Sequence, residues 1–169
     1  MISKKMEKAI NDQIKWEFYS AYLYLSMAAW CERKGLLGCA NWMKVQREEE
    51  IFHAMKFYGY VIERGGAVAL QAIDAPEIDW KSLTAVFEQT KKHEQSVTKR
   101  INDLMDLAMK EKDHAAVIFL QWYVSEQVEE EASVAAVLDK IKLVGEGPSL
   151  YLLDQELAAW VFTPPAKGA

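Results

Sequence analysis

Apolar residues recur at spacings of three and four positions along most of the 169-residue chain, which is typical of amphipathic helices. Glycine and proline are sparse and gathered at a few places, so long helices are expected between those places. The pattern predicts a first helix from about Ser3 to Lys34. After a short turn that begins at Gly35, it predicts a second, antiparallel helix that ends near Gly65.

A stretch from about residue 67 to residue 81 shows no clear helical period and contains Pro76. Its length suits a crossover along a four-helix bundle, which would make the third helix parallel to the second. Ser82 and Asp113 can cap the third and fourth helices, and the fourth should end in the turn Gly145-Glu146-Gly147. We therefore expect one all-α domain over the whole chain, with an antiparallel four-helix bundle over about residues 3–145.

The end of the chain differs from the bundle in composition. Pro148 suits the start of a short fifth helix over about residues 148–161, which is apolar on most sides. A helix of that kind is not stable alone, so it should pack against the bundle or be covered by other subunits. Residues 162–169 should form an extended tail, and its role stays open.

A carboxylate and an imidazole interrupt the apolar stripe of the second helix. Glu50 and His53 are three residues apart and therefore share the helix face that would otherwise bury apolar side chains. A buried carboxylate must be paired, protonated or bound to a metal, because leaving it unpaired is very costly. Helices often contain Glu-x-x-His by chance, so this pair alone is a weak signal.

The same spacing recurs in the second half of the chain. Two sets of three polar residues have matching separations: Glu17, Glu50 and His53, then Glu94, Gln127 and Glu130. Each residue falls in the apolar stripe of its helix, which argues against a coincidence of exposed charges. Two facing hairpins would surround a two-metal site with carboxylates and one imidazole. Such ligands suit iron or manganese, whereas structural zinc prefers thiolates.

The two expected metals have different ligands. Glu50 and Glu130 are placed to bridge both metals, and His53 would complete the coordination of one. Gln127 is a neutral and weak ligand, so the second metal should be held more loosely. Tyr24 lies on the inner face of the first helix, either as a core residue with a satisfied hydroxyl or as a donor or electron source at a metal ligand.

A further acidic group flanks this constellation: Glu49, Glu126 and Glu129. Glu49 and Glu126 occupy matching positions in the two halves, which favours a third cation site over a solvated acidic face. For Glu48 and Glu131 the solvated face is the preferred interpretation.

Composition and charge narrow the choice of function. The formal charge of -5 and the pI of about 5.3 argue against binding of nucleic acid, which needs a basic face. We expect no membrane span and no signal peptide, because no apolar run is long enough. Cys31 and Cys39 lack zinc-type spacing, which favours structural thiols in a reducing cytoplasm. His93 and His114 lack partners at helical spacing and are expected on the surface.

Several stretches resemble those of prokaryotic non-haem ferritins: Asn11 to Ser20, Glu49 to Met55, His93-Glu94 and, most specifically, Phe119 to Glu131. The resemblance covers nearly the whole chain. It implies a ferroxidase that oxidises Fe(II) with O2 or peroxide and stores a ferric mineral inside a shell of 24 subunits.

By position, the resemblance also implies the ligands of each iron: Glu17, Glu50 and His53 for the first, and Glu50, Glu94 and Glu130 for the second, with Gln127 adjacent. Glu49, Glu126 and Glu129 match the third iron site of bacterial members, and Tyr24 matches the family's site tyrosine. Haem is not expected, because Ile51 stands where bacterioferritins have their haem methionine.

Related proteins depart from this chain at identifiable positions. Bacterioferritins have Glu-x-x-His in both hairpins, whereas the second pair here is Gln127 and Glu130. Rubrerythrins need four cysteines, and DNA-binding mini-ferritins lack the fifth helix. Two alternative functions stay open. One is a non-catalytic iron cage, although ferritin chains without catalytic activity lose metal ligands that are kept here. The other is a radical-generating di-iron oxygenase, although the chains of those enzymes are longer.

Overall fold

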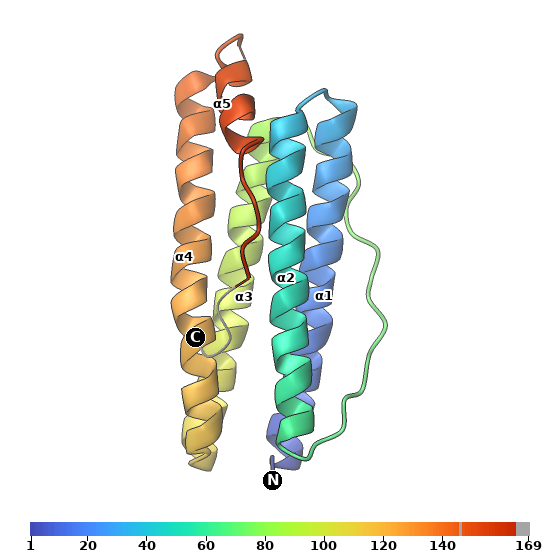
Figure 1. Ribbon diagram of the computed structural model, residues 1–169, viewed down its shortest axis with the longest axis vertical. Helices are drawn as coiled ribbons and strands as arrows, with labels where there is room; N and C mark the ends of the chain where they lie inside the picture. Colours follow the sequence, from blue (N-terminus) through green and yellow to red (C-terminus); the bar gives the residue numbers. More distant parts are fainter. Residues whose placement is uncertain (146, 165–169) are drawn as a thin grey trace.

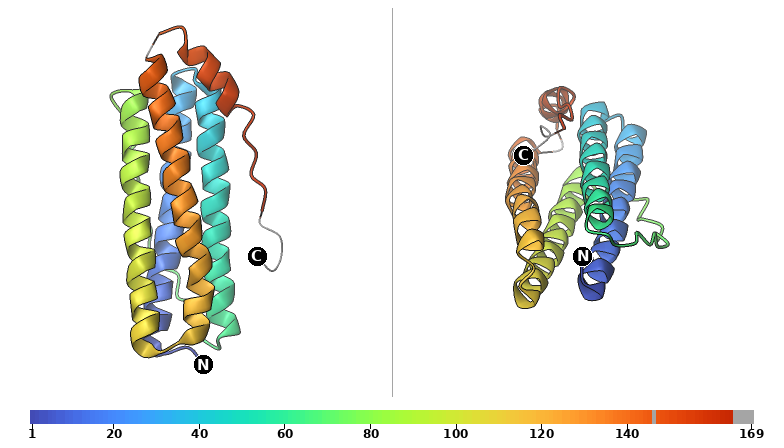
Figure 2. Two further views of the ribbon diagram at one scale, coloured as in Figure 1. Left: turned by 90° about the vertical axis from the view of Figure 1, so that its left-hand side faces the viewer. Right: turned by 60° about the horizontal axis from the view of Figure 1, so that its bottom comes forward.

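The computed structural model describes residues 1–145 and 147–164, which form five helices and no strand (Figure 1). The helices are α1 (Lys4–Arg33), α2 (Leu37–Glu63), α3 (Leu83–Glu111), α4 (His114–Val144) and α5 (Leu150–Leu157). The four long helices form the predicted bundle, and the short α5 packs at one end of it (Figure 2). Glu146 of the expected turn and residues 165–169 of the expected tail lie outside the described residues.

Helices α3 and α4 begin at the residues expected to cap them. Ser82 Oγ accepts a hydrogen bond from the backbone N–H of Ala85 at 3.1 Å, and Asp113 Oδ1 accepts one from Ala116 at 3.1 Å. Each bond satisfies a donor that the first turn of a helix would otherwise leave unpaired. Gly65 ends α2 with a φ of 70°, a conformation that favours glycine.

The segment between α2 and α3 runs along the length of the bundle beside α1, so α3 is parallel to α2, as predicted (Figure 1). Asn11 in α1 fixes its start, because its amide donates to Ala67 O at 2.9 Å and its Oδ1 accepts from Ala69 N at 2.7 Å. At the other end, Trp30 Nε1 donates to Asp79 Oδ1 at 3.0 Å.

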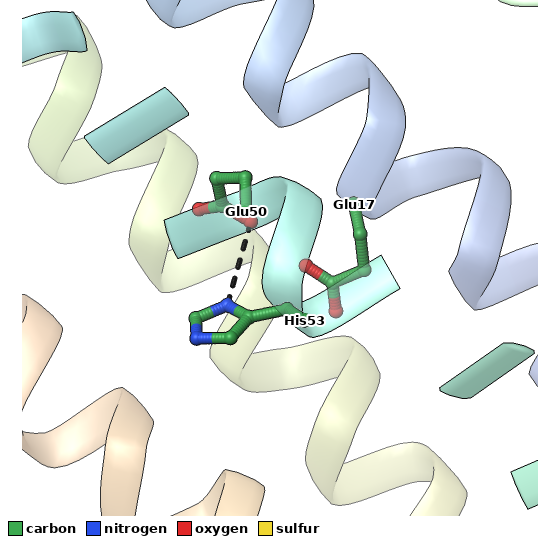
Figure 3. A group of neighbouring side chains, drawn as sticks. All are labelled: Glu17, Glu50 and His53. Carbon is green, nitrogen blue, oxygen red and sulfur yellow. Dashed lines mark ion pairs between the residues drawn. The ribbon is translucent and has the colours of Figure 1, made fainter. Parts of the chain in front are cut away.

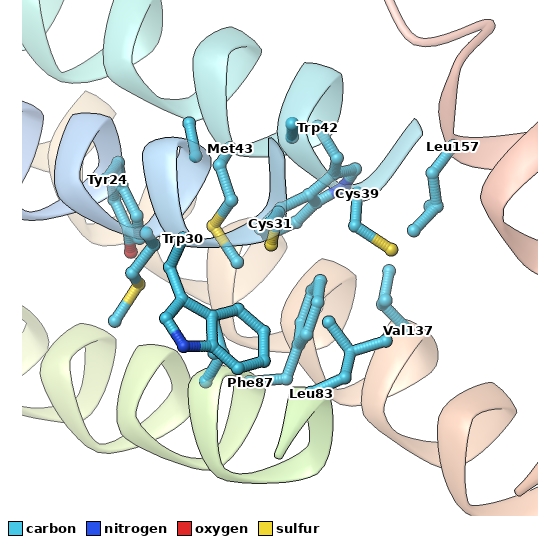
Figure 4. Close-up of a cluster of buried hydrophobic side chains, with 14 of the residues drawn as sticks. Tyr24, Trp30, Cys31, Cys39, Trp42, Met43, Leu83, Phe87, Val137 and Leu157 are labelled. Atoms are coloured by element: carbon cyan, nitrogen blue, oxygen red, sulfur yellow. The ribbon is translucent and has the colours of Figure 1, made fainter. Parts of the chain in front are cut away.

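Two apolar clusters fill the bundle, one toward α5 and one toward the opposite end. The cluster near α5 includes Tyr24, Trp42 and Phe87 (Figure 4). On all four long helices, the polar residues predicted to bind metal lie between the two clusters. Each fully buried large apolar side chain contributes about 1.5–3 kcal/mol, and this burial on both sides can offset the cost of a buried polar layer.

Helix α5 is attached to the first turn of α2. Asp154 Oδ1 accepts the backbone N–H of Cys39 at 2.8 Å and caps α2, whose own N-cap residue is Leu36. A Cβ on Gly38 would lie 1.6 Å from Asp154 O, so only glycine allows this approach. The helix ends at Leu157, earlier than the expected residue 161, because Asn41 Nδ2 donates to the carbonyls of Leu157 (3.2 Å) and Trp160 (2.9 Å).

The chain then turns back and runs in extended form beside α2 (Figures 1 and 2). The Phe162 ring packs against the Phe52 ring, with centroids 6.2 Å apart. None of the helices in the described ranges combines the length and the apolar character needed to cross a membrane.

Candidate metal centre

All four long helices contribute to one buried polar layer, and six side chains in it are at most 6% exposed: Glu17, Glu50, His53, Glu94, Gln127 and Glu130. The helical spacing of three residues explains why α2 and α4 each place two of them on the inner face. The structure therefore brings together all six residues of the two matching sets.

In the half of the layer from α1 and α2, two carboxylate oxygens have no hydrogen-bond partner among the described residues. One ligand atom from each of Glu17, Glu50 and His53 lies within 4.8 Å of the other two (Figure 3). His53 Nδ1 is 3.7 Å from Glu50 Oε2. Both Glu17 Oε2 and Glu50 Oε2 are buried without a hydrogen-bond partner in the described structure, whereas Glu17 Oε1 accepts from Gln13 Nε2 at 2.8 Å. Unpartnered buried carboxylate oxygens suit a cation.

In the half from α3 and α4, both oxygens of Glu94 accept hydrogen bonds. Glu94 Oε1 accepts a hydrogen bond from the hydroxyl of Tyr24, and Glu94 Oε2 accepts one from Gln127 Nε2 at 3.2 Å. Gln127 Nε2 also lies 3.2 Å from Thr98 Oγ1. Gln127 therefore orients Glu94 through its amide nitrogen. The Tyr24 hydroxyl is satisfied in the core by donating to Glu94, a predicted metal ligand, and a role as an electron source stays a prediction.

His53 joins the buried layer to the flanking acidic group. Its Nε2 is 3.9 Å from Glu126 Oε1, and ligand atoms of His53, Glu126 and Glu130 also lie within 4.8 Å of one another. Tyr123 donates its hydroxyl to the backbone carbonyl of His53 at 2.8 Å and so ties α4 to α2 at this level. The imidazole thus has a carboxylate beside each ring nitrogen.

Burial and mutual repulsion change the acidity of these groups. Burial raises the pKa of Glu50 well above its ordinary value, and the charges of Glu94 and Glu17 raise it further. Burial also raises the pKa of Glu130 well above its ordinary value, and the charge of Glu94 adds to this increase. Burial opposes protonation of His53, yet the surrounding carboxylates, Glu126 first, raise its pKa overall. A bound cation would favour the ionised carboxylates, so metal binding and proton release are coupled here.

The three residues of the flanking acidic group line one pocket of about 270 Å³ between α2, α4 and α5: Glu49, Glu126 and Glu129. Burial raises the pKa of Glu49 to about 7; His53 opposes this increase, and Glu126 and Glu129 add to it. By contrast, Glu48 pairs with Arg47, and Glu131 accepts a hydrogen bond from Thr98 at 2.6 Å.

The surface position expected for His93 is wrong. Its side chain is half-buried, its Nε2 lies 2.7 Å from Ser20 Oγ, and burial lowers its pKa to about 4. His114 is exposed, as predicted. Gln13 and Thr98 contact site residues although the motif assigned them no role. Their polar character on inner helix faces is the signal that could have identified them.

Comparisons with known proteins identify the family. The ferritin family model, described as a ferritin-like domain, matches residues 7–144. The chain is 47% identical to the bacterial non-heme ferritin of Campylobacter jejuni, over 92% of this chain and 93% of that protein. It is 44% identical to a probable bacterial non-heme ferritin-like protein of Haemophilus influenzae, over 93% and 96% of the two chains.

Solved structures are equally similar. An open-pore ferritin from the hyperthermophilic archaeon Archaeoglobus fulgidus has a TM-score of 0.93 and 52% identity, covering 95% of this chain and 98% of that one. A form of the same archaeal ferritin engineered to be closed has a TM-score of 0.95. The family expected from the sequence motifs is confirmed: the chain belongs to the ferritins, among the prokaryotic non-haem members.

Proposed function

We propose that this chain stores iron, as its family does, and that its buried polar layer oxidises Fe(II) as substrate. One observation carries the proposal: Glu17 and Glu50 each keep a buried oxygen without a partner among the described residues, and one ligand atom of each carboxylate lies within 4.8 Å of an imidazole nitrogen of His53. Such an arrangement is costly for a structural core but suits capture of a cation with oxygen and imidazole ligands.

The two halves of the layer would hold two Fe(II) ions side by side. Glu17, Glu50 and His53 would bind the first ion, and Glu94 and Glu130 would bind the second. Glu50 would be shared between them. Two adjacent Fe(II) ions can deliver two electrons to O2 or H2O2 together, which avoids release of superoxide. Tyr24 and Gln127 would keep Glu94 oriented through their hydrogen bonds.

The flanking acidic group would hold a third iron ion. Glu49, Glu126 and Glu129 add negative charge beside the pair, which lowers the free energy of an additional cation there. Glu126 also lies 3.9 Å from His53 Nε2, so this ion would sit next to the first iron rather than at an independent surface site.

We further propose a cytoplasmic homo-oligomeric shell of 24 subunits. Large apolar side chains are exposed near α5, including Leu143 at 86%, Leu152 at 71% and Tyr151 at 66%. Apolar side chains in such a group suit burial by neighbouring subunits. Cys31 and Cys39 are buried free thiols, which suits a reducing compartment.

Aerobic addition of Fe(II) in a stopped-flow spectrometer tests the oxidation step. We expect ferric absorbance to appear within seconds, together with consumption of O2, faster than in buffer that lacks the protein. A ferric signal no faster than in buffer, with Fe(II) still bound, would instead support the non-catalytic cage.

A further inference from the structure

The pocket beside the metal centre extends well beyond the three acidic residues assigned to it. It is lined by Glu130 at its inner end and by Glu156 and Trp160 at its outer end, next to α5. Along α4, Glu130, Ser133, Val137 and Lys140 follow one another at helical spacing and all line the pocket. With a rise of about 1.5 Å per residue, this row is about 15 Å long. The pocket therefore connects a predicted iron ligand with the protein surface.

Two oxygen atoms along this pocket are buried and unpartnered. Gln46 is only 3% exposed and donates its amide nitrogen to Glu49, whereas its Oε1 finds no partner in the described ranges. Ser133 Oγ is likewise buried without a partner. Unpaired polar atoms in a protein interior call for an explanation, and neutral oxygens in an acidic pocket are ligands that hard cations accept.

The outer end of the pocket carries charges of both signs. Lys140 Nζ pairs with Glu156, and their side chains are 48% and 51% exposed. Trp160 lies beside them, held by Asn41 and by contact with Trp42 at a centroid separation of 6.1 Å. The ion pair is too exposed to add much stability. Asp154 and Asn41 already attach α5 to α2, so docking of α5 does not depend on that ion pair.

We propose that this pocket is a passage for metal cations between the third site and the surface beside α5, with Gln46 Oε1 and Ser133 Oγ as neutral ligands along it and the Lys140–Glu156 pair as an electrostatic gate. The inference rests on the proposed third cation site. In the gate, the Lys140 ammonium neutralises the carboxylate that would otherwise attract cations to the opening.

Opposite effects of two neutral substitutions test the gate. Lys140→Gln leaves the Glu156 carboxylate unpaired and should speed cation entry about two- to fivefold. Glu156→Gln leaves the ammonium unpaired and should slow entry by a similar factor. A purely structural ion pair predicts the same direction for both, because either substitution breaks the same contact. Rates that shift in one direction, or not at all, would overturn the gate.

Tb(III) luminescence excited through tryptophan supplies the measurement, in assembled protein without iron. Tb(III) prefers oxygen ligands, and Trp160 at the opening should transfer energy to an ion in the pocket. Trp160→Phe should therefore lower the signal, although Trp42, 6.1 Å from Trp160, and Trp122, 5.5 Å from His53, can still excite an ion deeper in the pocket. An unchanged signal in this variant would place the ion away from the opening and overturn the proposal.

Gln46→Leu and Ser133→Ala test the neutral ligands. Each should weaken Tb(III) binding severalfold, whereas Ser125→Ala, at an exposed serine of the same helix, should leave it unchanged. Equal affinities in all three variants would reject the passage. Because Tb(III) binding needs no oxidation of iron, its failure would leave the ferroxidase proposal intact. Conversely, a protein that fails to oxidise Fe(II) could still show the passage.

Discussion

The two helical hairpins that meet at the metal centre have polar residues at matching positions. The hydrogen bonding of those residues differs between the two hairpins. In the hairpin of α1 and α2, Glu17 and Glu50 each keep one buried oxygen unpartnered within the described structure. In the hairpin of α3 and α4, the matching Glu94 accepts hydrogen bonds from Tyr24 and Gln127 on its two oxygens. The first hairpin therefore has unpartnered carboxylate oxygens that suit a cation, whereas Glu94 in the second hairpin is already held in place by hydrogen bonds.

Besides Tyr24, one source of the difference is the pair of matching positions Glu50 and Gln127. A carboxylate only accepts hydrogen bonds when ionised, whereas an amide also donates. The amide of Gln127 therefore orients Glu94, while the carboxylate of Glu50 is repelled by Glu94 and Glu17, which raises the pKa of Glu50, and its own charge raises the pKa of Glu130. We expect the first hairpin to bind iron more tightly, and the second to hold its ion more weakly in a fixed geometry.

The largest effect is expected from Glu50→Ala, which removes the ligand shared by both halves. The initial rate of Fe(II) oxidation should fall at least about a hundredfold. The bundle should still fold, because the substitution also removes a charge that repels Glu94 and Glu17. Glu48→Ala, two residues away and partly exposed, is the control and should retain the rate. An unchanged rate in Glu50→Ala would contradict the site assignment.

Gln127→Leu tests whether Gln127 sets the affinity of the weaker half, through its hydrogen bond to Glu94 and through any ligation by its amide oxygen. Leucine keeps a similar volume but cannot donate to Glu94, so affinity for the second iron should fall about tenfold while the first is retained. Anaerobic Fe(II) titration should then show a wider separation between the two binding steps. Gln121→Leu, at an exposed glutamine of the same helix, is the matched control. Equal weakening of both steps would remove the distinction between the hairpins.

Much of this arrangement is predictable from the sequence because it depends on local spacing. The caps at Ser82 and Asp113 and the parallel placement of α3 follow from neighbouring residues and from the length of the crossover. The matching separations in the two halves are sufficient to group the six inner polar residues. Each of these inferences needs only helical periodicity and connection length.

The remaining features depend on contacts between distant residues. His93 is half-buried because Ser20, on α1, lies against it. Helix α5 ends at Leu157 because Asn41, on α2, donates a hydrogen bond to the backbone carbonyl of Leu157. Gln127 donates its amide nitrogen to Glu94, a contact that the spacing did not predict, and its role as a weak metal ligand stays a prediction. Helical periodicity gives the face of a residue but not the partner that meets it there.

Replacing all three flanking acids with glutamine, Glu49, Glu126 and Glu129, should have a smaller effect. The initial oxidation at the pair should stay nearly intact, because the inner layer is untouched. Later turnover should change by a few-fold, since the added negative charge that favours another cation is lost. Anaerobic titration should show one tight iron fewer per chain than in the parent. Equal numbers in both would reduce these residues to an ordinary acidic face.

The smallest expected effect concerns a contact that joins the two hairpins away from the metal. Arg64, just after α2, places Nη2 3.1 Å and 3.0 Å from the two carboxylate oxygens of Asp113, which caps α4. Burial opposes ionisation of Asp113, but the hydrogen bonds from Arg64 and from the backbone N–H of Ala116, together with the charge of Arg64, outweigh it and lower the pKa of Asp113 below the ordinary value. The contact therefore adds stability above the unfolded-state pKa, and this contribution is lost as the pH falls through the folded-state pKa.

Asp113→Asn should keep the cap and lose the charge, since asparagine also caps helices well. Its free energy of unfolding should be about 1 kcal/mol lower than that of the parent at neutral pH. The difference should hold above about pH 5 and shrink below about pH 4, where the parent carboxylate takes up its proton. Urea unfolding across this range measures it, with Asp139→Asn, at an exposed position of α4, as the control. A difference independent of pH would mean that the two hairpins are joined here by hydrogen bonding alone, without the charge of Asp113.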